Sequence, residues 1–541
     1  MSYYSYLFET KSIQRFLFAN GKLKDMVSGS DLIDGLLGKP LDQALAVVGL
    51  EASEQNCFRR AGGALYLAVE ESERDKLARF RAVWRIVVSR LLPDLGQVDT
   101  ITNGANAGEA LRQGLQDLRA ARNRPFPNLP LASPAAARDP RTGGVAVEVE
   151  HGESIDASTA AKRAFAGKSG AVVARFMGPD GASERYHWPN SFAEDAHHTV
   201  RFPMERRSHV ALVHADGNGM GQVLRKLHQV LRDLNSGDYI RMFRYFSDGL
   251  AAATSAAAAD ASADLLAAAN DKKVVPARPL VLGGDDLTLL IRDELAIGFA
   301  EKFLLAFEQQ TEALLRDLVE QAPENTRDAL REALPPHLSA CAGIVFMKPA
   351  QPFAACHTIS ESLCKRAKNI SSSTPNTTAG GNGPGVTPST IAFHKLKAAL
   401  MEDADELFKA ELQTAGGLRL GLPAYAAKRS ENGIPAMNGL RDLARPFEQG
   451  HLNAKRLRRL LTVIHQDAAL AASEYQRWRE VSDRKQINEF DRALETLLGP
   501  NVESTLPVAP MQGDGRATPL ADLLVYLDTL PGQTPGEQDE D

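Results

Sequence analysis

The stretch Pro279–Arg292 reads PLVLGGDDLTLLIR, with two adjacent aspartates directly after two glycines. Runs of Val, Leu and Thr on either side predict two short buried strands. Gly283 and Gly284 permit a tight turn, so the stretch predicts a β-hairpin that carries Asp285 and Asp286 at its tip. Because side chains alternate along a strand, we expect the two carboxylates to point apart, with one of them facing a site directly. A plain Gly-Asp turn without function also fits these residues taken alone.

A third carboxylate comes from Asp216, which ends the strand predicted over 208–216. From residue 208 onward the pattern predicts strand, helix, strand, strand, helix and strand, the order of a ferredoxin-like unit with four antiparallel strands and two helices on one face. In that order the first strand lies beside the central hairpin, so Asp216 should lie next to Asp285 and Asp286. Three converging carboxylates repel one another unless a cation neutralises them. Hard oxygen ligands favour two Mg²⁺ or Mn²⁺ ions, which can clamp the attacking and leaving oxygens of a phosphoryl transfer.

The composition of the 541 residues is that of an ordinary globular protein, with 44% hydrophobic and 24% charged residues. A net charge of −6 excludes a global basic footprint for nucleic acid. The four cysteines form no CxxC pair, which argues against a disulfide framework and against a standard zinc site. No apolar run is long enough to span a bilayer, so we expect a cytoplasmic protein without a membrane partner.

Periodicity and composition divide the chain into five parts. Residues 1–125 predict a first α/β unit, with a strand over 3–10 and a hairpin over 58–70. The other parts are a linker or eroded module poor in periodic pattern (126–205), the unit with the Asp-Asp hairpin (206–398), a domain of amphipathic helices (399–525) and a disordered tail (526–541).

The motifs HADGNGMG (214–221) and LGGDDLTLLI (282–291) together resemble the catalytic palm of the large subunit of type III CRISPR effector complexes. That palm is related to GGDEF diguanylate cyclases and to nucleotide polymerases. The resemblance covers most of the chain: residues 6–33 look like the opening of a first palm. FRRAGGALYLAV (58–69) looks like its degenerate hairpin, with Ala64 and Leu65 in place of the acids.

The resemblance implies an α+β fold with two ferredoxin-like palms, the first degenerate and the second catalytic, followed by a C-terminal helical domain. In the family, the palm joins ATP molecules 3′ to 5′ into cyclic oligoadenylates that act as antiviral second messengers. It also implies ATP as substrate, with CRISPR RNA and the small and backbone subunits of an effector complex as partners.

Site residues follow from the same resemblance, read onto this sequence. The expected metal ligands and catalytic residues are Asp216, Asp285 and Asp286, with the Gly217 carbonyl as a further metal ligand. The expected nucleotide-binding residues are Gly283, Gly284, Gly217, Asn218, Gly221, Ser30 and Lys368. Some relatives carry an Asp at the Asn218 position, and an amide supplies no carboxylate. Ser30 equally fits a helix cap, and Lys368 equally fits a solvated helix face.

Two departures from the family narrow the expected activity. Many members begin with an HD nuclease domain, whereas this chain starts at the first palm and has no His-Asp dipeptide, so we expect no such nuclease. Many members carry a cysteine zinc module between the palms, whereas residues 126–205 contain no cysteine, so we expect no zinc.

The leading interpretation is therefore a Mg²⁺-dependent nucleotidyltransferase or cyclase acting on ATP. One alternative is a scaffold subunit that docks guide-RNA-bound partners and has a vestigial palm. Another is a stand-alone GGDEF-like cyclase. The contrast between an acid-bearing hairpin and an acid-free one favours an enzyme, because a pure scaffold gives no reason to retain acids in only one of them.

Overall fold

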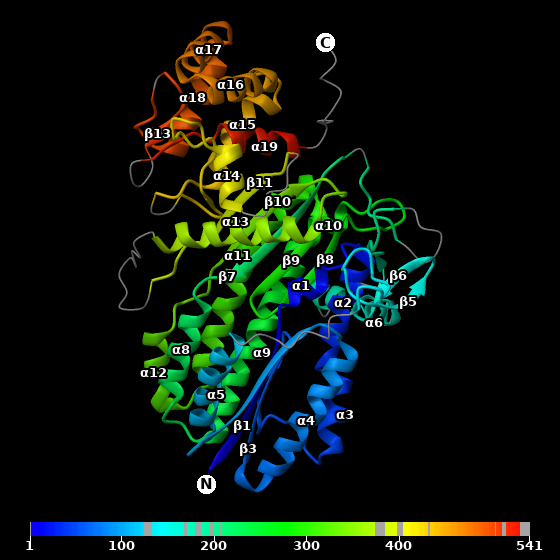
Figure 1. The fold of residues 1–541 in the computed structure, drawn as a ribbon. Coiled ribbons are helices and arrows are strands. Elements are labelled where there is room, and N and C mark those ends of the chain that lie inside the picture. Colours follow the sequence, from blue (N-terminus) through cyan, green and yellow to red (C-terminus); the bar gives the residue numbers. More distant parts are fainter. Residues whose placement is uncertain are drawn as a thin grey trace.

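The computed structural model describes residues 2–123, 133–166, 170–178, 185–193, 200–205, 207–373, 385–397, 404–430, 433–503, 505–510 and 515–530. Figure 1 shows an N-terminal α/β unit at the bottom, a second α/β unit in the middle and a group of helices at the top. The sequence predicted this fold class, two ferredoxin-like units followed by a helical domain, and the structure confirms it.

The first unit is a four-stranded antiparallel sheet in the order β2-β3-β1-β4. Its elements are β1 (Tyr3–Lys11), α1 (Ile13–Phe18), α2 (Leu23–Leu36), α3 (Lys39–Val47), β2 (Cys57–Ala61), β3 (Ala64–Glu70), α4 (Arg74–Leu91), β4 (Gly96–Gly104) and α5 (Ala107–Arg122). Alternation along β1 places Tyr6 and Phe8 on one face of the sheet, where their rings meet Phe80 and Trp84 of α4 edge to face. The α2–α3 crossover and α4 therefore cover one face, as a ferredoxin-like unit requires.

The second unit is a six-stranded sheet in the order β12-β11-β10-β7-β9-β8. Its elements are β7 (Val210–Gly217), α8 (Met220–Leu231), α9 (Ser236–Ala261), α10 (Ala263–Ala267), β8 (Ala277–Gly283), β9 (Asp286–Arg292), α11 (Asp293–Gln321), α12 (Glu324–Ala333), β10 (Ala340–Met347), α13 (Phe353–Ser373), β11 (Thr390–Lys395) and β12 (Tyr425–Ala426). The ferredoxin-like part is β8-β9-β7-β10, which is antiparallel throughout. β11 then adds to β10 in parallel.

The two faces of the second sheet are covered by different helices. Ala211, Val213 and Ala215 of β7 pack with α9 and α11, whereas Val210 and Leu212 pack with α13. Both faces are thus buried, which explains the nearly continuous apolar runs in these strands.

The two units pack directly on each other. Phe58 on β2 meets the rings of Tyr239 and Phe243 on α9 at centroid distances of 5.9 and 6.1 Å. At the neighbouring hairpin tips, a Cβ built on Gly283 would lie only 3.7 Å from the Cα of Gly62. The β2–β3 and β8–β9 hairpins therefore meet tip to tip.

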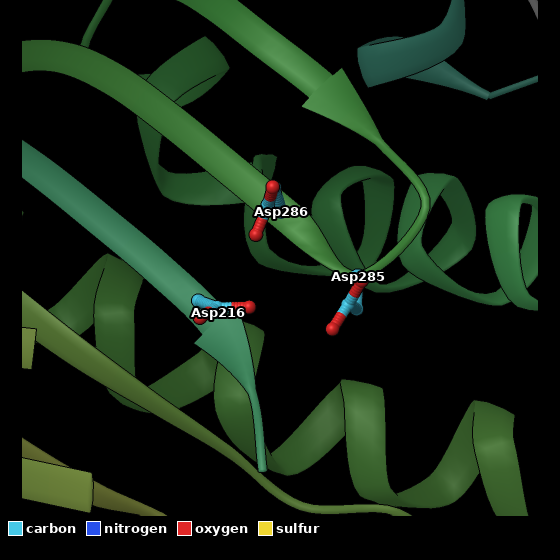
Figure 2. A group of neighbouring side chains, drawn as sticks. All are labelled: Asp216, Asp285 and Asp286. Atoms are coloured by element: carbon cyan, nitrogen blue, oxygen red, sulfur yellow. The ribbon is translucent and has the colours of Figure 1, made fainter. Parts of the chain in front are cut away.

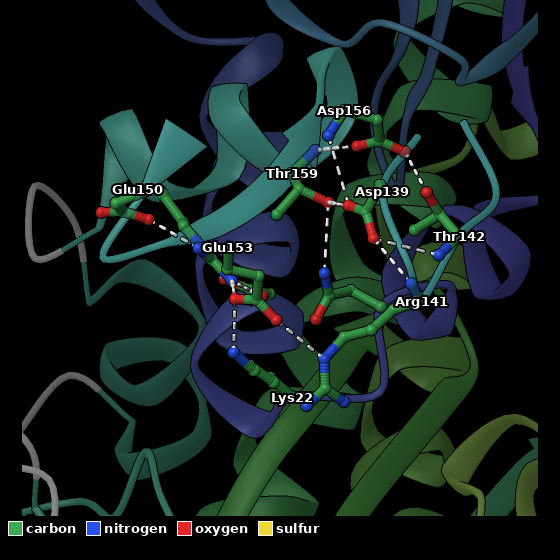
Figure 3. Close-up of polar contacts among 11 residues, drawn as sticks. Lys22, Asp139, Arg141, Thr142, Glu150, Glu153, Asp156 and Thr159 are labelled. Atoms are coloured by element: carbon green, nitrogen blue, oxygen red, sulfur yellow. Dashed lines mark hydrogen bonds and ion pairs between the residues drawn. The ribbon is translucent and has the colours of Figure 1, made fainter. Parts of the chain in front are cut away.

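The segment between the units is a small folded module, where the sequence suggested a linker or an eroded module. It contains the hairpin β5 (Ala146–Glu150) and β6 (Glu153–Asp156) and the helices α6 (Ala157–Phe165) and α7 (Ala171–Met177). Hydrogen bonds to two buried carboxylates, Asp139 and Asp156, hold its loops together (Figure 3). Short charged elements of this kind give little periodic signal, which is why the pattern did not predict them.

Lys22 and Arg163 attach this module to the first unit. Lys22, just before α2, pairs with Glu153 at 2.7 Å (Figure 3). Arg163 on α6 pairs with Asp25 of α2 at 3.1 Å and with Glu150 at 2.6 Å. Part of the predicted linker, residues 124–132 among them, lies outside the described residues, as does the predicted tail from residue 531 onward. The predicted start of the tail at residue 526 is wrong, because residues 526–529 belong to a helix that ends at Thr529.

The C-terminal helices are α14 (Ala404–Leu412), α15 (Met437–Glu448), α16 (Ala454–Gln466), α17 (Ala468–Val481), α18 (Arg484–Leu498) and α19 (Leu520–Thr529), with the short pair β13 (Ala509–Pro510) and β14 (Arg516–Ala517). Helix α19 joins this domain to the second sheet, because Asp528 pairs with Lys395 of β11 at 2.7 Å. No helix in the described part of the chain has both the length and the apolar character that crossing a membrane requires.

Candidate active site

Three carboxylates converge where β7 ends beside the β8–β9 hairpin (Figure 2). Asp216, Asp285 and Asp286 each offer an oxygen, and these oxygens lie within 4.8 Å of one another. Antiparallel pairing of β7 with β9, with Ala215 opposite Leu287, brings Asp216 to the hairpin tip. The convergence predicted from the ferredoxin-like element order is therefore present. It is also the one group of three or more potential metal-ligating His, Cys, Asp or Glu side chains within the described ranges.

The expectation that the adjacent aspartates point apart is wrong, because Asp285 does not belong to a strand. Gly283 pairs with Asp286, so Gly284 and Asp285 form a two-residue turn. Gly284 has a φ of +62°, while Asp285 has a negative φ, the pattern of a type II′ turn with glycine first. Strand alternation does not govern a turn residue, and the side chain of Asp285 is free to lie on the same side as Asp286.

Gly217 allows Asp285 to approach β7. A Cβ built on Gly217 would lie 2.7 Å from Oδ2 and 2.9 Å from Cβ of Asp285. Any side chain there would displace that carboxylate from the cluster. The role of Gly217 that the structure shows is thus to leave space, and its carbonyl accepts a hydrogen bond from Lys368 at 2.8 Å.

Lys368 points into the acid cluster and does not lie on a solvated helix face. Its ammonium group pairs with Asp216. Close packing of α13 on β10 places it there: a Cβ on Gly343 would lie 2.1 Å from the carbonyl oxygen of Ser360 and 2.6 Å from the backbone nitrogen of Cys364. Lys368 follows one helical turn after Cys364, directly over the end of β7.

Burial and mutual repulsion give the three acids different pKa values. Burial, together with the nearby charge of Asp216, raises the pKa of Asp285 to about 6. Burial and the charges of Asp285 and Asp216 raise the pKa of Asp286 well above its usual range. Burial also disfavours the charged form of Asp216, but a hydrogen bond from Asp286 and the charge of Lys368 outweigh it, so the pKa of Asp216 is lowered.

The residues fit a divalent cation site. Three carboxylates from two neighbouring strand ends supply only hard oxygen ligands, the type that Mg²⁺ and Mn²⁺ prefer. Burial and the charges of the neighbouring aspartates raise the pKa values of Asp285 and Asp286, and a bound cation would offset the repulsion among the three groups.

Asn218 and Gly221, two further residues of the predicted site, differ in their surroundings. The side-chain amide of Asn218 donates to Ser339 at 2.9 Å, and its buried Oδ1 has no partner among the described residues. Gly221 lies in the first turn of α8, where a Cβ would meet no atom within 4 Å. Asn218 thus borders the site as a partly unsatisfied amide, whereas Gly221 faces open space.

Ser30 does not cap a helix. It lies within α2, whose N-cap is Lys22, and its buried hydroxyl donates to the Leu280 carbonyl on β8. It lines a cavity of about 180 Å³ between the two hairpins, together with Gly62, Gly63 and Asp286. A serine within VSGSDLI resembles a cap in sequence, but tertiary packing places it between the two units.

In the acid-free β2–β3 hairpin, the positions that correspond to the two aspartates lie one residue earlier than the sequence motif suggested. Ala61 pairs with Ala64, so its turn is Gly62-Gly63, and both residues have positive φ, the pattern of a type I′ turn. The positions equivalent to Asp285 and Asp286 are therefore Gly63 and Ala64, where the sequence pattern suggested Ala64 and Leu65. No acid stands at either equivalent position.

Sequence reasoning missed two residues that shape the site. Thr254 on α9 donates to the Gly284 carbonyl at 2.6 Å and thereby fixes the hairpin tip. Gly343 sets the depth at which α13 packs. A lone threonine in an alanine-rich helix was the available signal for Thr254, and nothing local distinguishes Gly343 from any other strand glycine.

Of the comparisons with known proteins, only the one with solved structures found similar chains. The sequence matches no protein-family model and no curated protein sequence. Among solved structures, Csm1 from T. onnurineus gives a TM-score of 0.49 at 13% identity, over 97% of this chain and 69% of that chain. The Csm1–Csm4 cassette gives a TM-score of 0.46 at 12% identity in its apo form, over 92% of this chain and 66% of that chain.

The same cassette in complex with AMPPNP gives a TM-score of 0.47 at 12% identity, over 97% and 69% of the two chains. This chain thus spans about two thirds of the length of the chains it matches. Csm1 belongs to the family of large type III CRISPR subunits that the motifs resemble. With TM-scores below 0.5 and identities of 12–13%, no residue role and no activity of this chain follows from the likeness.

Proposed function

We propose that this protein is a divalent-cation-dependent nucleotidyltransferase that joins ATP molecules into cyclic oligonucleotides. The observation that carries the proposal is the convergence of Asp216, Asp285 and Asp286 at a glycine-bounded hairpin tip, directly beside a second hairpin that lacks acids. Two nucleotides would meet where the tips meet, one held by each unit. The cavity of about 180 Å³ at this junction is too small for a whole nucleotide and suits a base or a sugar.

The three aspartates would hold the metal ions, with the Gly217 carbonyl beside them. When bound, such ions polarise phosphoryl oxygens and lower the pKa of a hydroxyl nucleophile. The chain itself orients the reactants: Gly284 leaves room for a phosphate against the turn, and Thr254 holds that turn in place. Lys368 pairs with Asp216 in the metal-free site. When cations occupy the acids, the ammonium group of Lys368 would interact with the bound phosphates instead.

We further propose that this protein takes part in antiviral defence within a type III CRISPR-like complex. This proposal is supported by the HADGNGMG and LGGDDLTLLI motifs and by the contrast between the acid-bearing and acid-free hairpins. Csm1–Csm4 cassettes have been solved in complex with one ATP, with cA3 and with cA4. By analogy, the partners of this chain would be ATP, guide RNA and the other subunits of such a complex.

Incubation of the purified protein with each labelled nucleoside triphosphate and Mg²⁺ or Mn²⁺ tests the proposal. We expect cyclic oligoadenylates from ATP, resolved by chromatography and mass spectrometry, and none when Asp285 and Asp286 are both changed to Asn. A cyclic dinucleotide from GTP would instead favour a GGDEF-like cyclase. Absence of any product from all four nucleotides, in the presence of guide RNA and partner subunits, would favour a scaffold.

A further inference from the structure

Arg59 of the first unit reaches the hairpin tip of the second. It lies on β2, opposite Tyr66 on β3. A Cβ built on Gly62 would lie 3.5 Å from Nη2 of Arg59, and a Cβ built on Gly284 would lie 4.0 Å from the same atom. The guanidinium therefore stands at the junction of the two tips, beside the turn that carries Asp285.

The guanidinium is held in place without being neutralised. It stacks over the ring of Tyr66, 5.7 Å from the ring centroid. Glu9, which accepts the hydroxyl of Tyr66, is already paired with Arg122. Within the part of the chain that the structure describes, the guanidinium of Arg59 has no ion pair or hydrogen bond, and its Nε is buried without an acceptor.

The neighbouring arginine, Arg60, has a structural role. Arg60 donates to the Leu37 carbonyl at 2.7 Å and pairs with Asp42 at 2.8 Å, which ties β2 to the junction of α2 and α3. Arg59 has no such partners. A partly buried guanidinium without an acceptor is unfavourable, so its presence at this junction points to an anion that is supplied from outside the chain.

We propose that Arg59 binds the phosphates of the nucleotide whose reacting phosphorus lies at the acid cluster. This inference rests on the proposed function and assigns the acid-free unit an active part in it. Lys368 already pairs with Asp216 on the opposite side of the cluster, so the two cations approach from different units. A guanidinium presents paired N–H donors that match two phosphate oxygens, which a lysine cannot reproduce.

The competing explanation is that Arg59 only balances the acids, because its positive charge opposes the burial that raises the pKa of Asp285. The two explanations differ in their prediction for phosphate binding. Removal of a cation that only balances the acids leaves the affinity for tripolyphosphate unchanged, whereas removal of a phosphate ligand lowers it. In both cases Mn²⁺ meets less repulsion and binds as tightly as before or more tightly. If instead Arg59 holds the carboxylates in place, its removal weakens Mn²⁺ binding.

Calorimetry on the full chain tests the proposal with three probes: Mn²⁺ alone, tripolyphosphate with Mn²⁺, and adenosine. The variants are Arg59→Ala and Arg59→Lys, with Arg85→Gln as a control on the exposed side of α4. We expect the dissociation constant of tripolyphosphate to rise about 10- to 100-fold in Arg59→Ala, as loss of charge-assisted hydrogen bonds implies. Arg59→Lys should retain part of the affinity, and binding of Mn²⁺ and adenosine should not weaken.

The outcomes separate this inference from the function on which it rests. Equal tripolyphosphate affinity in the wild type and Arg59→Ala would overturn the role of Arg59 and leave the proposed function intact. Joint loss of Mn²⁺ and tripolyphosphate binding in both Arg59 variants would also overturn it, because Arg59 would then be structural. Failure of the wild type and Arg85→Gln to bind tripolyphosphate would overturn the proposed function itself, and the inference with it.

Discussion

At the scale of single residues, the site depends on how closely three carboxylates are forced together. Gly217 leaves space for the Asp285 carboxylate, and Gly284 supplies the positive φ of the turn. The pKa values of Asp285 and Asp286 are raised in this setting. A carboxyl group whose pKa is higher in the folded protein binds more protons there than in the unfolded chain. The acids therefore destabilise the metal-free fold at neutral pH, which is typical of a functional site.

The metal-free protein should lose stability as pH rises between about 4 and 6, because the pKa of Asp285 goes from its ordinary 3.8 to about 6 on folding. Below this window the group is protonated in both states and has no effect. Mn²⁺ competes with the same protons, so its apparent affinity should rise through the window. Hydrogen exchange at the β8–β9 hairpin and Mn²⁺ titration at several pH values measure both trends. An Asp285→Asn variant that keeps the wild-type pH dependence would contradict this assignment.

At the scale of elements, the site is assembled by the approach of α13 to β10. Gly343 permits backbone-to-backbone packing, Cys364 donates to the Cys341 carbonyl at 3.2 Å, and Lys368 follows one turn later. The module between the units is stabilised differently. Its buried aspartates accept hydrogen bonds from backbone and hydroxyl groups, and these bonds fix its loops.

Gly343→Ala should push α13 away from the sheet, since the new Cβ would lie 2.1 Å from the Ser360 carbonyl oxygen. We expect a loss of about 3 kcal/mol of stability, as for other overpacked cores, and a reduced rate of nucleotide joining as Lys368 moves from Asp216. Thermal unfolding and product formation measure the two effects. Gly298→Ala, on a helix where a Cβ meets no atom within 4 Å, is the matched control. Wild-type behaviour of both variants would refute the packing argument.

Asp139→Ala should loosen the module between the units. The carboxylate accepts from the backbone nitrogens of Arg141 at 2.8 Å and Asp156 at 3.2 Å, and the Asp156 donor would be left buried and unpaired. Such groups cost about 1–3 kcal/mol each. Hydrogen exchange over residues 139–159 should accelerate, while exchange in β7 and β9 stays unchanged. Unaltered protection across the module would show that Asp139 does not hold it together.

At the scale of the whole molecule, two related units present unequal hairpins to each other. The sequence predicted both units and the position of Asp216, because buried strands and the ferredoxin-like order are visible in the pattern of apolar residues. It could not place Asp285, since one residue of register decides whether a side chain lies in a turn or in a strand. Nor could it place Ser30 or Arg59, whose surroundings come from the other unit.

Ser30→Trp tests the division of labour between the units. The larger side chain would enter the cavity of about 180 Å³ between the hairpins and break the hydrogen bond to the Leu280 carbonyl. We expect weaker nucleotide binding or shorter products with unchanged Mn²⁺ binding. Ser28→Trp is a matched test of local disruption, because Ser28 lies on the same helix and, within the described ranges, its hydroxyl bonds only to the Lys24 carbonyl of that helix at 2.9 Å. Identical products from the Ser30→Trp variant and the wild type would exclude the cavity from nucleotide binding.

We propose that Asp216, Asp285 and Asp286 form one divalent cation site that serves nucleotide joining. The most direct test of this proposal is the stoichiometry of Mn²⁺ binding, measured by electron paramagnetic resonance with and without a non-hydrolysable ATP analogue. The wild type should bind Mn²⁺ more tightly and in greater number with the analogue. Asp216→Asn should abolish this binding while the fold persists, because the amide keeps the shape of the side chain and its oxygen can still accept a hydrogen bond from Lys368. Unchanged Mn²⁺ binding in the Asp216→Asn variant would contradict the account.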